Sequence, residues 1–199
     1  MRKTVFIVSH VGSGYKVLLS TLLRNPRIIP ISNQSQNSYY TLFDILNAPI
    51  EYSFFNKATY FIDSILYNHL FSAYDAFKFC KFIYLIEQPR YALPRIIQEK
   101  SKSNLLNCQR HYLYRIRRMC EMAKRTPNAI FLQGNDLYKP ETYNIIENYL
   151  NLNEKLEIPS LKPDYLSIDC VPQNLLDLSE SAYEKYLYFV KQQNLIFVN

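Results

Sequence analysis

One stretch near the amino terminus constrains the fold more than any other: residues 5–23, with the sequence VFIVSHVGSGYKVLLSTLL. The β-branched, apolar run VFIV predicts a buried strand, and a helical pattern begins near Tyr15. Between them lie Gly12 and Gly14, two of only three glycines in 199 residues. A strand, a glycine turn and a helix in this order are typical of a phosphate-binding loop.

The chemistry of such a loop is local. Glycine reaches backbone angles that are closed to other residues, so main-chain N–H groups come close to a ligand. The unpaired N–H groups and the positive dipole end of the following helix point to the same place. Lys16 adds a full positive charge. The loop therefore predicts binding of a phosphate or a similar anion; the alternative is a turn without a ligand.

The loop departs from the ATP-binding motif G-x-x-x-x-G-K-[ST]. Tyr15 stands between Gly14 and Lys16, and Val17 occupies the position of the Ser or Thr that binds magnesium. Because that hydroxyl is missing, we expect phosphate binding without metal-assisted phosphoryl transfer. A small-molecule kinase is the weaker interpretation.

Length and composition narrow the choice further. A chain of 199 residues predicts one domain, residues 1–199. The net charge of +6 suits an anionic ligand, but the basic residues form no long run, so nucleic acid is a weaker partner. The four cysteines include no C-x-x-C pair, so we expect free thiols and no metal site. No apolar run approaches about 18 residues and no signal peptide is evident, so we expect a cytoplasmic protein without membrane contact.

Strands alternate with helices along the chain, which predicts an α/β fold of three layers around a mainly parallel sheet. The segment KFIYLI at 81–86 is apolar almost throughout, as expected for a central parallel strand. Apolar residues between Ile62 and Phe71 recur at helical spacing. Further strands are expected at 28–31 and 129–132, and further helices at 142–150 and 181–193.

A long helix is expected at 103–125. One side of it is apolar, and the other carries basic residues that we interpret as a solvated face rather than a binding patch. These residues are Arg110, Arg115, Arg117, Arg118, Lys124 and Arg125.

Three segments in order, spread between residues 12 and 152, resemble the motifs of sulfotransferases. GSGYKVLLSTLLRNPRI resembles the family's opening motif, in which a basic residue precedes S-G-T-T and a proline motif follows one helix later. KFIYLIEQPRYALPRI resembles a strand that ends in R-D/N-P-R with a Ser eight residues after the first Arg. RTPNAIFLQGNDLYKPETYNIIENYLNL resembles a strand that leads through y-E-d-L into a helix ending in f-L-g-l.

The resemblance implies a sulfuryl-transfer enzyme whose donor is 3′-phosphoadenosine 5′-phosphosulfate (PAPS), with no metal and with a small-molecule or glycan hydroxyl or amine as acceptor. It also implies which residues bind the donor. Those for the 5′-phosphosulfate are Gly12, Ser13, Gly14, Tyr15, Lys16 and Val17, and those for the 3′-phosphate are Arg90 and Arg95.

The chain departs from the family at several of these positions. Gly12 replaces the basic residue of the first motif, so Lys16 is expected to supply the catalytic cation. Glu87 replaces the first Arg of R-D-P-R, which reverses the charge beside the expected phosphate, and Arg95 replaces the later Ser and restores a positive contact. Lys57, in NKAT, falls where relatives carry K-x-P near the reacting group.

Sulfuryl transfer needs a base for the acceptor's proton. His10, at the mouth of the loop, is the expected candidate, with His69, Glu51 and His111 as alternatives. Two other functions stay open beside the sulfotransferase: a protein of this fold that has lost its donor site and binds a partner, which Glu87 motivates, and the small-molecule kinase.

Overall fold

The computed structural model describes most of the chain in several stretches. They are residues 3–30, 39–40, 60–65, 70–71, 80–99, 104–126, 129–160, 171–192 and 196–197.

A six-stranded sheet forms the centre of the described structure, in the order β2-β4-β1-β6-β7-β8, and every pairing in it is parallel. β1 and β6 lie side by side in its middle, and their apolar runs at 5–8 and 82–86 are fully buried, as expected for central parallel strands. The predicted α/β fold with a mainly parallel sheet is confirmed. The strands are β1 (Lys3–Ser9), β2 (Ile28–Pro30), β4 (Tyr60–Ile65), β6 (Cys80–Ile86), β7 (Ala129–Gln133) and β8 (Ile196–Phe197), with β3 (Tyr39–Tyr40) and β5 (Leu70–Phe71) paired separately.

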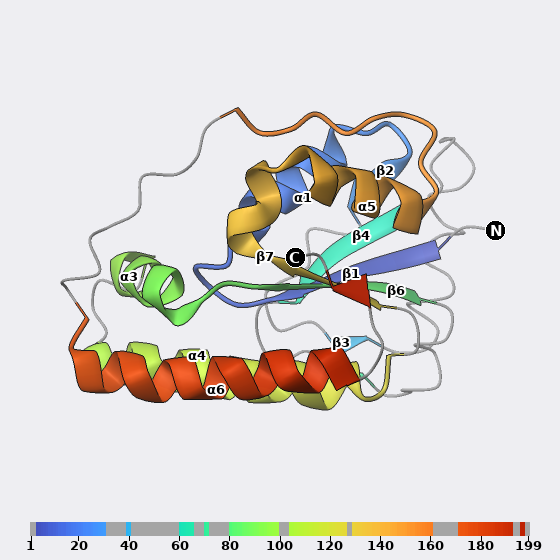
Figure 1. Ribbon diagram of the computed structural model, residues 1–199. Coiled ribbons are helices and arrows are strands. Elements are labelled where there is room, and N and C mark those ends of the chain that lie inside the picture. Colours follow the sequence, from blue (N-terminus) through green and yellow to red (C-terminus); the bar gives the residue numbers. More distant parts are fainter. Residues whose placement is uncertain are drawn as a thin grey trace.

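Helices cover both faces of the sheet and give three layers (Figure 1). One face, which includes Val5 and Ile7 of β1, packs against α1 and α5. The other, which includes Phe6 and Val8, packs against α3, α4 and α6. The helices are α1 (Tyr15–Leu23), α3 (Pro89–Glu99), α4 (Leu105–Ala123), α5 (Pro140–Leu150) and α6 (Gln173–Gln192), with the short 3₁₀ helix η2 (Gly134–Tyr138) after β7.

Local sequence signals set several helix boundaries. α1 begins after Gly14, whose left-handed conformation (φ 84°) turns the chain out of the loop, and ends just before Asn25-Pro26. Asn104 caps α4 by accepting a hydrogen bond from the Asn107 N–H at 2.8 Å. α5 starts at Pro140, where the missing N–H costs no helical hydrogen bond.

The helical spacing between Ile62 and Phe71 gave a wrong prediction. Residues 60–65 form strand β4, which lies between β2 and β1. Tyr60 and Ile62 are both buried, so the alternation of a strand fits this part of the segment. Pairing with β1 decides the structure here, and apolar spacing over so few residues does not distinguish a helix from a strand.

Two findings concern membrane spans and the cysteines. Among the described residues, no helix combines the length and the apolar character that a membrane span requires. Cys80, Cys108 and Cys120 are free thiols, as expected. Burial raises the pKa of Cys80 to about 12 and that of Cys120 to about 11, so both stay protonated at neutral pH. Cys170 lies outside the described residues.

Candidate functional site

The glycine loop, residues 10–14, lies at the carboxyl end of β1, where the chain changes direction across the sheet. After β1 the chain continues into α1 on one face, whereas after the neighbouring β6 it continues into α3 on the other face. In open parallel sheets, the crevice outside the strands at such a switch point is where ligands bind. Figure 1 shows α3 beside the loop that joins β1 to α1.

The loop has the conformation that its glycines predict. Gly12 and Gly14 both have φ near +84°, a region that disfavours side chains. The Ser13 N–H donates to the His10 carbonyl at 3.2 Å and closes the turn. Gly14 then caps α1 without a side-chain hydrogen bond, and Lys16 is exposed in the first turn. The helix therefore presents its first N–H groups and a lysine at the end of the central strand.

All three glycines of the chain meet at this site. A Cβ atom on Gly12 would lie 2.8 Å from the Ala92 carbonyl oxygen of α3. A Cβ atom on Gly134, at the start of η2, would lie 2.3 Å from the Ser13 carbonyl oxygen and 2.7 Å from Glu87 Oε2. Gly134 was not singled out from the sequence. Two signals in the sequence could have identified it: glycine is rare in this chain, and Gly134 directly follows a buried strand.

His10 is fully buried and braces the ends of β1 and β6 against each other. Its Nε2 accepts a hydrogen bond from the Glu87 N–H at 3.0 Å, so Nδ1 carries the ring proton and donates it to the Val11 carbonyl at 2.7 Å. Burial lowers the pKa of His10 to about 3, with smaller contributions from the nearby positive charges of Arg115 and Arg95. The ring is neutral, and neither nitrogen is open to an acceptor substrate in this arrangement.

Glu87 lies beneath the loop and not at the surface. Its carboxylate is fully buried, with Oε1 accepting from the Gln88 N–H at 2.8 Å and Oε2 lying 3.6 Å from Arg95 Nη1. Burial raises the pKa of Glu87 to about 7, against the lowering effects of the Gln88 N–H and of Arg95, while Asp136 raises it further. Arg95 also donates from Nη1 to the Gly12 carbonyl at 2.9 Å.

The remaining predicted site residues are spread more widely. Arg90 is half exposed and pairs with Glu180 of α6 at 2.9 Å. His111 lies partly buried on α4. Tyr15 and Val17, in the first turn of α1, are half-buried and pack against the core. The predicted residues outside the described part of the chain are Lys57, His69 and Glu51.

Arg115 was placed on the solvated basic face of the long helix, and this was wrong. It is only 3% exposed, and its Nη2 donates to the Ser9 carbonyl at 2.7 Å, where β1 ends. Arg115 lies three residues after Tyr112 and four before Met119, on the buried stripe of α4. Tyr112 donates in the same way to the Glu87 carbonyl at 2.8 Å. Two α4 side chains thus satisfy one carbonyl at the end of β1 and one directly after β6.

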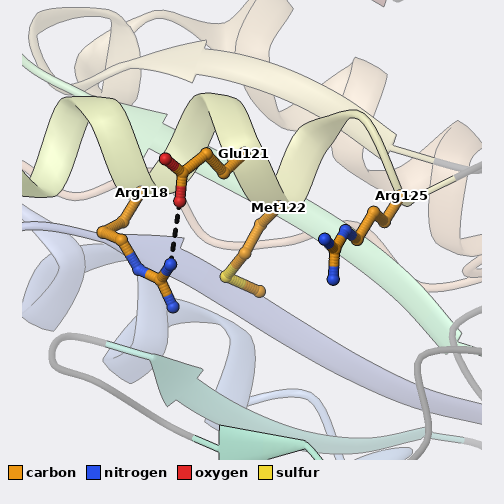
Figure 2. Close-up of a pocket in the computed structure, with 4 residues that line it drawn as sticks. All are labelled: Arg118, Glu121, Met122 and Arg125. Atoms are coloured by element: carbon orange, nitrogen blue, oxygen red, sulfur yellow. Dashed lines mark hydrogen bonds and ion pairs between the residues drawn. The ribbon is translucent and has the colours of Figure 1, made fainter.

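A pocket of about 110 Å³ lies away from the glycine loop, on the last turns of α4. Arg118, Glu121, Met122 and Arg125 line it, and Figure 2 shows the Met122 side chain between the two arginines. Glu121 accepts from Arg118 at 2.8 Å, so part of the positive charge is compensated within the pocket. None of the residues predicted from the sequence to bind the donor lines this pocket.

The described residues contain no group of three or more His, Cys, Asp or Glu side chains that could hold a metal ion.

Comparison of the chain with protein-family models gives no match, and comparison with curated protein sequences gives no significant match.

Proposed function

We propose that this protein is a sulfotransferase-like enzyme that transfers a sulfuryl group from PAPS to a hydroxyl or amine acceptor. The observation that carries the proposal is the glycine loop at the switch point of the sheet, with two glycines at positive φ and an α1 amino terminus that no side chain caps. This arrangement suits a tetrahedral anion, and the resemblance to sulfotransferases implies that this anion belongs to PAPS.

The loop fits the 5′-phosphosulfate group. The first N–H groups of α1 and the ammonium of Lys16 are donors of the right charge and kind for anionic oxygens. The Ser13 hydroxyl is buried and has no hydrogen-bond partner among the described residues, which adds a donor in the loop. When bound, the donor supplies the activated sulfuryl group. The loop groups would hold and orient the donor and stabilise the negative charge that develops on its oxygens during transfer.

The arginines expected for the 3′-phosphate fit less well as they stand. Arg90 pairs with Glu180, and Arg95 is engaged with the Gly12 carbonyl and with Glu87. This observation favours a second candidate function, in which the fold binds an anionic partner without transferring a sulfuryl group. The two functions differ in one measurable respect: only in the sulfotransferase should the adenosine 3′-phosphate contribute to affinity.

A nucleotide panel in a thermal-shift assay tests the proposal. We expect adenosine 3′,5′-bisphosphate to raise the melting temperature more than adenosine 5′-phosphate does at equal concentration, because a ligand that binds only the folded state stabilises it more when it binds more tightly. Equal shifts from the two nucleotides favour the anion-binding protein. A shift with ATP and magnesium alone favours the kinase, and no shift with any nucleotide contradicts nucleotide binding.

Replacing Lys16 by alanine is expected to weaken binding of adenosine 3′,5′-bisphosphate by about tenfold or more, since a charge-assisted hydrogen bond contributes about 1.5–3 kcal/mol. Folding should change little because Lys16 is exposed. Isothermal titration of wild type, Lys16→Ala and the control Lys185→Ala measures the effect. Lys185 is an exposed lysine of α6, on the opposite face of the sheet. Equal affinities in all three proteins would remove Lys16 from the site.

A further inference from the structure

We propose that Arg95 holds the glycine loop in its anion-binding form through the Gly12 carbonyl, and that Glu87 limits the anion affinity of the loop by neutralising Arg95. Arg95 is then a positioning residue that does not touch the donor. The inference rests on the proposed function, because it concerns the same loop.

The first step is geometric. In a trans peptide the carbonyl and the following N–H point in opposite directions, so fixing one direction fixes the other. Arg95 Nη1 holds the Gly12 carbonyl at 2.9 Å on the side of α3, and the Ser13 N–H on the other side of that peptide donates to His10. Arg95 therefore fixes the plane of the first peptide of the turn between the two glycines.

The next peptide is fixed by close packing. The Ser13 carbonyl oxygen lies so close to Gly134 that no side chain fits there. The Gly14 N–H, which shares this peptide, must point away from Gly134. Two carbonyls of the loop are thus directed into the protein, which leaves the N–H groups at the start of α1 to face an anion. Successive N–H groups around a left-handed residue form such anion-binding concavities.

The second step is electrostatic. Glu87 Oε2 and Arg95 Nη1 are 3.6 Å apart in a buried setting, and Oε2 accepts no hydrogen bond from the described residues. An ionised Glu87 therefore cancels much of the field that Arg95 would exert on an anion in the loop. The other groups that face Glu87 come from several neighbouring elements: His10 after β1, Tyr112 on α4, Asp136 and Tyr138 on η2, and Tyr183 on α6. Arg115 on α4 acts on His10.

Glu87 is expected to change charge near neutral pH, whereas His10 and the three tyrosines are not. His10 is neutral there because its pKa is lowered to about 3, and burial raises the pKa values of the three tyrosines. Asp136 pairs with Lys139 at 2.6 Å. The pKa of Glu87 is raised to about 7, so Glu87 is largely neutral at pH 6 and ionised at pH 8. The loop should therefore bind an anion more tightly at pH 6.

The decisive test compares the two partners of this ion pair. Adenosine 5′-phosphosulfate is the probe, because its charge does not change between pH 6 and pH 8, and isothermal titration gives its affinity. At pH 8 we expect Arg95→Met to weaken binding by about tenfold and Arg95→Lys to restore part of the loss. Glu87→Gln should instead tighten binding about threefold and remove the difference between pH 6 and pH 8. If both substitutions weaken binding, the pair is only structural and the proposal is wrong.

Hydrogen exchange on the ligand-free protein separates this proposal from the proposed function. We expect Arg95→Met to speed the exchange of amides in residues 12–18, Arg95→Lys to do so less, and Glu87→Gln to leave it unchanged, since the bond from Arg95 to Gly12 remains. Unchanged exchange in Arg95→Met would overturn the positioning role. If the wild type does not bind the probe at all, the proposed function fails, and the exchange result alone decides whether Arg95 holds the loop.

Discussion

The free energy of unfolding is expected to be nearly constant between pH 4.5 and pH 6.5 and to fall steeply below pH 4.5, because His10 and Glu87 titrate in opposite senses. His10 has an ordinary pKa of 6.5 and a folded-state pKa of about 3, so its stabilising effect is complete above pH 6.5 and is lost as the pH falls to 3. At about 1.4 kcal/mol per pH unit between these values, the loss reaches about 5 kcal/mol.

Glu87 acts the other way. Its folded-state pKa of about 7 lies above the ordinary 4.5, so the folded protein keeps a proton that the unfolded chain releases. The contribution of Glu87 to stability is therefore complete below pH 4.5, and about 3 kcal/mol of it is lost as the pH rises to 7. Between pH 4.5 and pH 6.5 the two slopes have equal size and opposite sign, which produces the plateau.

Urea unfolding from pH 3 to pH 8 measures the profile, and two variants separate its parts. His10→Gln keeps an acceptor and a donor on the side chain but does not titrate, so its stability should decline steadily from pH 4.5 to pH 7 without the acid loss. Glu87→Gln should show stability rising from pH 3 to pH 6.5 without a plateau. Glu184→Gln, which removes an exposed carboxylate on α6, is the control. An acid loss in His10→Gln as large as in the wild type would contradict the assignment.

Replacing Gly134 by alanine is expected to destabilise the fold by about 3 kcal/mol, the upper part of the usual range for overpacking a core. The added Cβ would lie 2.3 Å from the Ser13 carbonyl oxygen, and a backbone atom cannot move aside as the end of a flexible side chain can. Relief requires that η2 or the glycine loop shift. We therefore expect faster hydrogen exchange in residues 12–18 together with the lower stability.

Urea unfolding at pH 7 checks the Gly134→Ala prediction, with Gln133→Ala as the control. Gln133 ends β7 directly before Gly134, and its side chain is partly exposed, so its removal should cost much less. Wild-type stability and wild-type exchange in Gly134→Ala would show that the close approach to Ser13 does not hold the loop.

The sequence predicted those parts of the site that depend on neighbours along the chain. The strand before Gly12, the turn between the two glycines and the start of α1 near Tyr15 all follow from local backbone preferences, and all are confirmed. Arg115 was misplaced because a charged side chain is assigned to the surface by default. The Ser9 carbonyl that it satisfies is over a hundred residues away in sequence.

Glu87 shows a second limit of prediction. From the motif alone, its charge was expected to face a donor phosphate, but it lies under the loop with Arg95. Its neighbours include His10, which accepts a hydrogen bond from the Glu87 N–H, and Gly134 of η2, which lies close to the Glu87 carboxylate. Both belong to segments that meet Glu87 only in the folded sheet. Residue type at a motif position predicts which groups gather at a strand end, but not the direction in which each side chain points.

The central place of β1 has a consequence for how the chain folds during synthesis. β1 is the earliest of the six strands along the chain, yet its two partners are β4 and β6, which end at Ile65 and Ile86. One side of β1 can pair once β4 is complete, but the other stays without a sheet partner until more than eighty residues have been synthesised. The apolar run at 5–8 therefore stays exposed for a long time and is a target for chaperones, so nascent chains that end before β6 should bind them more strongly than chains that extend past it.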